Sequence, residues 1–201
     1  MARSAAFRAG AWLLILKLVT AQAGQESGTA TPSAAIYDVD PVHSSVIFRI
    51  KHLSVAYFYG RFNEVAGTFA FDDRDPAHST FDLQVKVASI DTNNADRDKH
   101  LKSAEFFDLE RYPLITFKSR SARKTGENTL EVRGDLTLRG VTRALTVTVE
   151  RSGCGAGMRG EQRCGWETTF EIRRSEFGMT ALLGPVGDEV RLLVSVEGVR
   201  R

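Results

Sequence analysis

The stretch FDLQVKV, residues 81–87, alternates apolar and polar side chains without interruption. Successive side chains of a β-strand point to opposite faces, so the apolar side chains of this stretch would share one face and the polar ones the other. A period of two therefore predicts a strand with one buried and one solvated face over residues 81–87.

The same alternation recurs along most of the chain, in about eight segments: SSVIFRIKHL, RFNEVAGTFAF, FDLQVKV, LITFKSR, TLEVRGDLTLR, TRALTVTVE, CGWETTFEIR and DEVRLLVSVE. Most joints between them are short and rich in turn residues, as at 73–76 and 125–128, so neighbours in sequence should pair as antiparallel hairpins. About eight such strands with one apolar face close most easily into a barrel. We expect an all-β fold, an eight-stranded antiparallel β-barrel.

One connection is long and has the composition of a short helix, SIDTNNADRDKHLKSAEFFD at residues 89–108. Either of two consecutive asparagines can cap a helix whose first turn is acidic and whose end is basic, the charge order that the helix dipole favours. Arg97 and His100 lie one turn apart and share a face. With Asp98 they form either a polar clamp for a ligand head group or a tether between this helical crossover and the barrel. Acid–base catalysis is the weaker interpretation, because acids near a helix start are commonly caps and surface pairs.

Residues 1–23 have the order of a secretory signal peptide, with Arg3 and Arg8 before the apolar run AWLLILKLVTA and small residues up to Ala23. The run is too short for a membrane span, and Lys17 interrupts it. We expect cleavage after Ala23, a flexible leader at 24–35 and a single domain at 36–201.

Cleavage would remove three basic and no acidic residues, which changes the formal charge from +2 to about −1. A nucleic-acid-binding protein would show a clustered basic face, so this class is not expected. Export also places the chain in an oxidising compartment, where Cys154 and Cys164 should form a disulfide that staples a hairpin, free thiols being the alternative.

The segment between the cysteines contains Gly155–Gly160, which matches G-x-G-x-x-G, but a second strand follows it where a dinucleotide site needs a helix. We interpret it as a hairpin loop. The four histidines, His43, His52, His78 and His100, are scattered without metal-ligand spacing. We expect no metal and no cofactor.

The chain contains twelve phenylalanines, many of which fall on the inward face of their strands. They either pack a solid core or line a lumen for an apolar ligand, and both interpretations stay open. In the second, the lumen is lined by Phe48, Ile50, Phe62, Phe69, Val85, Phe117, Leu145, Trp166 and Phe170.

Seven segments in order resemble one family, the YceI-like or polyisoprenoid-binding proteins, over roughly residues 36–198. They are YDVDPVHSSVIF (37–48), GRFNEVAGTF (60–69), SIDTNNADRDKHLKSAEFFD (89–108), YPLITF (112–117), GDLTLRGVT (134–142), RSEFG (174–178) and VGDEV (186–190).

The resemblance implies a lipocalin-like barrel in the bacterial periplasm that holds a polyisoprenoid, isoprenoid quinone or fatty-acyl chain in its lumen. It also implies that the crossover is a structural hallmark and not an active site. We therefore expect an exported lipid carrier without a reaction, monomeric or homodimeric, with a membrane or membrane protein as donor or acceptor. The disulfide is not part of the family pattern.

Two alternatives remain beside the carrier. One is an interaction or stress-response protein whose packed barrel docks a membrane or redox partner. The other is an enzyme on a small apolar substrate, which would need a titratable group facing the lumen, with His52 and His100 as candidates.

Overall fold

The computed structural model describes Met1 and residues 34–201, so the expected signal peptide apart from Met1 and nearly all of the expected leader lie outside the described residues. The described chain is mostly strands with one α-helix, and it contains no helix long and apolar enough to cross a membrane. The elements are β1 Ala35–Val39, β2 Ser45–His52, β3 Ala56–Phe62, β4 Val65–Phe71, β5 Thr80–Lys86, β6 Ile90–Asp91, α1 Ala95–Lys102, β7 Leu114–Lys124, β8 Thr129–Leu138, β9 Val141–Ala156, β10 Gln162–Arg173 and β11 Val186–Arg200, with 3-10 turns at Pro76–His78, Val87–Ser89 and Arg174–Phe177.

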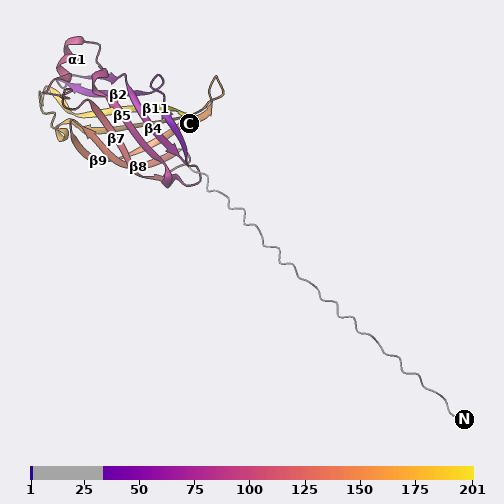
Figure 1. Ribbon diagram of the computed structural model, residues 1–201. Helices are drawn as coiled ribbons and strands as arrows, with labels where there is room; N and C mark the ends of the chain where they lie inside the picture. The colour runs from indigo at the N-terminus through magenta and orange to yellow at the C-terminus, as the bar shows by residue number, and fades with distance from the viewer. Residues whose placement is uncertain (2–33) are drawn as a thin grey trace. The chain divides into compact units, whose positions relative to one another are not determined.

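The strands form one closed antiparallel barrel (Figure 1). β1 and β2 both pair with β11 and run in the same direction, so together they fill one position in the barrel. The next position is shared by β3, which pairs with β2, and β4, which pairs with β1. The position after it is shared by β5, which pairs with β4, and β6, which pairs with β3. The expected eight-stranded antiparallel barrel is confirmed, with its first three strands each interrupted once.

These interruptions correct the expected strand bounds. RFNEVAGTFAF was predicted as one strand, but the ladder breaks at Asn63 and Glu64. The strand predicted over 81–87 ends at Lys86, and Val87 begins a 3-10 turn while staying buried. β1 was not predicted as a separate strand.

The break between β1 and β2 is held by charged side chains. The Arg163 guanidinium donates to the Asp40 carboxylate at 2.8 Å and also to Glu197. Hydrogen bonds from His43 and Arg163 hold the pKa of the Asp40 carboxyl well below its usual range. Asp40, His43 and Glu197 could together offer ligand atoms to a metal, but Arg163 already balances the two carboxylates.

The crossover forms the expected helix at one end of the barrel (Figure 1). Asn94 caps it by accepting a hydrogen bond from the Arg97 backbone N–H at 2.9 Å. Asp98 accepts hydrogen bonds from the backbone N–H and the hydroxyl of Thr92, which ties the helix to the segment that leaves β6. We call this end, with the hairpin turn β2–β3 and the loop β10–β11, the mouth.

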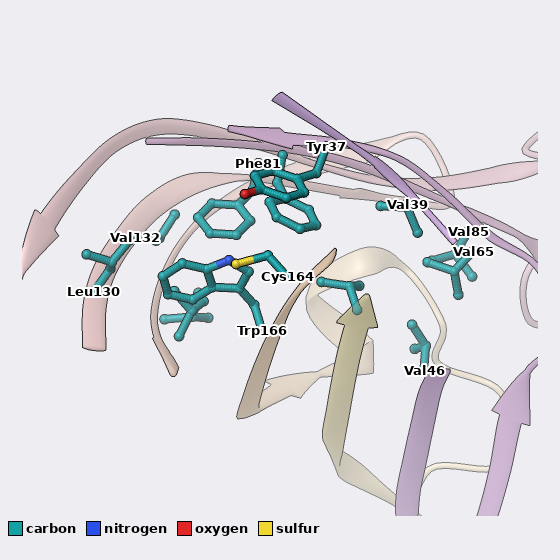
Figure 2. Packing of buried hydrophobic residues seen from close by; sticks show 14 of the residues in the cluster. Tyr37, Val39, Val46, Val65, Phe81, Val85, Leu130, Val132, Cys164 and Trp166 are labelled. Atoms are coloured by element: carbon teal, nitrogen blue, oxygen red, sulfur yellow. The ribbon is translucent and has the colours of Figure 1, made fainter. Parts of the chain in front are cut away.

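Aromatic side chains fill the opposite end, which we call the base. Phe81 packs edge-on against Trp166 (Figure 2), with ring centroids 5.7 Å apart. Phe69 stacks against both Phe81 and Tyr37. Cys164 is buried here and forms the expected disulfide with Cys154, its register partner across β9 and β10. Gly155–Gly160 belongs to this hairpin and its turn, as interpreted from the sequence.

One seam of the barrel is only partly closed. The ladder between β9 and β10 runs from Gln162 opposite Ala156 to Glu167 opposite Glu150. Nearer the mouth, the described residues of β9 pair only with β8, and those of β10 pair only with β11. A polar cleft of about 280 Å³ lies along this part of the seam.

Candidate functional site

The main hollow of the barrel lies at the mouth, beneath α1 and the segment that follows it. This cavity has a volume of about 450 Å³, within the range of pockets that hold small ligands. Its wall is mostly apolar and comes from β2, β3, β7, β8, β10, β11, the β10–β11 loop and the crossover: Phe48, Ile50, Ala56, Tyr57, Phe58, Phe62, Leu101, Phe106, Phe107, Ile115, Leu136, Leu138, Ile172, Met179, Leu182, Val186, Val190 and Leu192.

A second cavity of about 100 Å³ lies deeper in the barrel, towards the base. It shares four wall residues with the mouth cavity, namely Phe62, Ile115, Leu136 and Leu192, so the two cavities lie end to end. The other wall side chains are apolar except for Thr116, Glu167 and Thr168. The barrel is therefore packed with side chains at the base and hollow at the mouth, so a solid core and a lined lumen are each found at one end.

The structure places eight of the nine residues predicted to line the lumen on these walls. Phe48 and Ile50 line the mouth cavity, Phe62 lines both cavities, and the deeper one is lined by Val85, Phe117, Leu145, Trp166 and Phe170. Phe69 is the exception, because it is buried in the aromatic packing of the base beyond the deeper cavity.

Two of these phenylalanines depend on a glycine of the neighbouring strand. Phe48 pairs with Gly60 across β2 and β3, and a Cβ atom at Gly60 would lie 2.3 Å from the Phe48 ring. A Cβ atom at Gly134 would lie 2.6 Å from the Phe117 ring. The glycines leave the room that the two rings occupy, because a Cβ atom at either position would push the ring away.

The predicted polar residues lie at the mouth. Arg97 donates to the Thr92 hydroxyl at 2.9 Å and to its carbonyl at 2.6 Å, and the guanidinium stacks over Phe58. His100 bonds Glu105, and with His52 and Arg97 it lines the mouth cavity. Asp98 is not part of the cavity wall, and its hydrogen bonds to Thr92 are those of a tether, whereas Arg97 and His100 line the cavity.

Sequence reasoning did not find Arg174, which is 3% exposed. Its guanidinium donates to the carbonyls of Met179 and Ala181 in the β10–β11 loop and to those of Val186 and Gly187 at the start of β11. Burial lowers the pKa of this guanidinium, and Asp188 acts in the opposite direction. A lone arginine after a strand gives no periodic signal, so only its place in RSEFG could have marked it.

The chemistry that these walls offer is apolar contact with a basic entrance. The titratable residues that line the mouth cavity are His52, Tyr57, Arg97, His100 and Arg174, and among the described residues no Ser, Cys or carboxylate lines it. Trp166 adds a buried N–H in the deeper wall that finds no acceptor within the described residues. This arrangement suits an elongated apolar molecule with a polar or acidic end.

The sequence profile of the YceI-like domain matches residues 37–198. Protein YceI of Salmonella newport (strain SL254) is 41% identical over 175 residues, which cover 86% of this chain and 91% of the relative. Protein YceI of Escherichia coli O17:K52:H18 is 39% identical over 187 residues, covering 93% of this chain and 97% of the relative.

Solved structures share the barrel. BcnA of Burkholderia cenocepacia superposes with a TM-score of 0.73 at 25% identity, covering 79% of this chain and 98% of that one. A polyisoprenoid binding domain from Saccharophagus degradans shares the fold, with a TM-score of 0.64 at 14% identity over 84% of this chain and 99% of that one. From the profile match and the identity to the YceI proteins, this chain belongs to the YceI-like family.

Proposed function

We propose that this protein is an exported lipid carrier that holds a long apolar chain in the two cavities, without a reaction. The observation that carries this proposal is the pair of adjacent apolar cavities that run from the mouth towards a packed base. The Saccharophagus degradans domain of the same fold is described as binding a polyisoprenoid. A polyisoprenoid, an isoprenoid quinone or a fatty-acyl chain is therefore the cargo that we propose.

The free energy of burial is large enough for such a ligand. At about 0.8 kcal/mol per methylene, a chain of about sixteen carbons gains roughly 13 kcal/mol of gross burial. Association costs about 4 to 15 kcal/mol in lost freedom, so the gain from a chain of this length is comparable to or larger than the cost, and each methylene removed reduces it.

The polar end of the cargo would lie at the mouth. Arg97 is held by Thr92 and Phe58, and its Nη1 group makes no hydrogen bond with the described residues. A phosphate, carboxylate or quinone oxygen beside it would find a fixed donor. The apolar remainder would then extend past Phe62 towards Trp166.

The compartment follows from the same set of features. The disulfide between Cys154 and Cys164 suits an oxidising environment, and residues 1–23 have the order of a signal peptide. We propose the periplasm as the location, with a membrane or membrane protein as the source of the lipid.

Native mass spectrometry of the mature protein purified from the periplasm tests the proposal, followed by extraction of any bound molecule. We expect a stoichiometric lipid in the unaltered protein. A Leu192→Trp variant should lose it, because Leu192 lines both cavities, whereas Leu193→Trp should retain it, because Leu193 is 39% exposed and on the other face of β11.

An unaltered protein that is free of lipid, and stays so when isoprenoid and acyl lipids are added, would contradict the proposal. Equal lipid content in the folded Leu192→Trp and Leu193→Trp proteins would contradict the location of the cargo.

A further inference from the structure

Four large apolar side chains are exposed together at the mouth of the barrel. Leu53 is 56% exposed and Val55 81% exposed in the β2–β3 turn, and Leu182 is 53% and Leu183 42% exposed in the β10–β11 loop. The two segments lie side by side, because the Leu53 N–H donates to the Pro185 carbonyl at 2.7 Å. We call these four residues the apolar rim.

The backbone makes two of these leucines unexpected. Leu53 has a φ of 49° and Leu182 a φ of 55°, both in the left-handed region that glycine and asparagine occupy most easily. A leucine at such a position is disfavoured by its backbone conformation and by its exposure to water. Turn geometry does not account for either leucine, and Leu53 is not part of the cavity wall, so an apolar surface outside the barrel is the remaining reason for their exposed parts.

The rim is held in a defined shape. The buried Arg174 guanidinium binds carbonyls at Met179, Ala181 and Val186, which fixes the loop that carries Leu182 and Leu183. A surface that is ordered before it meets its partner loses less conformational freedom on binding.

The rim borders the entrance of the mouth cavity, and the charged side chains in the wall of this cavity are basic. Leu182 itself lines that cavity, together with Arg97, His52 and Tyr57. Tyr57 is half exposed beside the rim, with the Lys51 ammonium over its ring. Exposed apolar side chains, a tyrosine and basic side chains are the groups that favour the acyl boundary, the interface and the phosphates of an anionic membrane surface.

We propose that the apolar rim docks the barrel on an anionic phospholipid bilayer, with the rim in the acyl boundary and the cavity mouth facing the lipids. This inference rests on the proposed function, because it gives the route by which a lipid passes between a membrane and the lumen. The cargo would then enter without crossing water.

Flotation of the mature protein with vesicles tests the docking. The vesicles contain phosphatidylethanolamine with a minority of phosphatidylglycerol, and vesicles of phosphatidylcholine alone show the contribution of charge. The test variant is Leu53→Asn/Leu182→Asn, since asparagine suits left-handed backbone and should leave the melting temperature unchanged or higher. The control is Met158→Asn, a fully exposed apolar residue in the turn at the base.

We expect the double variant to bind the anionic vesicles at least about tenfold more weakly, and Met158→Asn to bind like the unaltered protein. Val55→Asn provides a second variant at a position without left-handed backbone, with a smaller loss in the same direction. Equal binding by the folded Leu53→Asn/Leu182→Asn protein, or no vesicle binding by the unaltered protein, would overturn the proposal.

Two further readouts separate this inference from the proposed function and from self-association. Lipid content is measured by mass spectrometry on the same preparations. If the unaltered protein contains lipid but does not bind vesicles, the membrane docking is refuted and the carrier function is not. If the unaltered protein contains no lipid but binds vesicles through the rim, the carrier function is refuted and the docking is not. Sedimentation shows whether the variant changes a dimer into a monomer. That change without vesicle binding would make the rim a dimer interface and would overturn the membrane proposal.

Discussion

Replacing Gly60 by alanine should narrow the mouth cavity with little effect on folding. The new Cβ atom would lie 2.3 Å from the Phe48 ring, whereas ordinary carbon contacts begin near about 3.4 Å, so the ring must move by about 1 Å or more. The space open to it is the cavity, because Phe48 lines that cavity.

The expected stability change is small because two terms oppose each other. Movement of the Phe48 ring weakens its contact with Phe62, now 5.9 Å between centroids, and such a pair contributes about 0.5 to 1.5 kcal/mol. Loss of a glycine from the unfolded chain stabilises by about 0.4 to 1 kcal/mol. The net change in unfolding free energy should therefore be within about 1 kcal/mol.

The effect on lipid affinity should be larger than the effect on stability. If the displaced ring excludes two methylenes from the cavity, affinity falls by about 1.6 kcal/mol, or roughly 15-fold. Competition of a fluorescent fatty acid with unlabelled lipid measures this change. Gly155→Ala is the control, since a Cβ atom there meets nothing within 4 Å. Unaltered affinity in a folded Gly60→Ala protein would refute the assignment of the mouth cavity as the binding site.

Three further results follow from contacts away from the mouth cavity. A Cys154→Ser/Cys164→Ser protein should lose about 2 to 3 kcal/mol of unfolding free energy, from a sequence separation of 10, and keep its lipid, as thermal melting and mass spectrometry would show. Asp98→Asn should lower the melting temperature without changing lipid content, because one amide oxygen replaces a charged acceptor of two hydrogen bonds. The pKa of the Asp40 carboxyl is lower in the folded state than in the unfolded state, so the ionised carboxylate stabilises the fold above about pH 4, and this stabilisation is lost as the pH falls towards the folded pKa. The melting temperatures of Asp40→Asn and the unaltered protein should therefore differ at neutral pH and converge in acid.

The barrel itself could be predicted because one physical requirement shapes every strand. Each strand buries one face, so the period of two appears in the sequence wherever the ladder runs. The crossover helix was equally visible, because the cap at Asn94 and the order of charges are local features.

The strand interruptions were also present in the sequence, although the pattern alone was interpreted as one strand. Phe62 and Phe69 are an odd number of residues apart, so an unbroken strand cannot point both into the barrel. The break at Asn63 and Glu64 restores the inward direction of both side chains. The same change of parity separates β1 from β2.

The hollow could not be predicted in this way. Whether inward side chains fill a barrel depends on their summed volume against the space between all the strands, which no local pattern reports. Phe69 lies in the packed base and Phe48 on an open wall because different side chains lie opposite them across the barrel.

The partly closed seam between β9 and β10 bears on how this protein avoids aggregation. A barrel normally removes the unpaired strand edges that recruit other chains, but here two short edges remain beyond Glu167 and Glu150. Charged side chains surround them, including Arg143, Glu171 and Arg173. An approaching strand would have to bury these charges unpaired, so the same residues that keep the seam polar also keep neighbouring molecules from adding to the sheet.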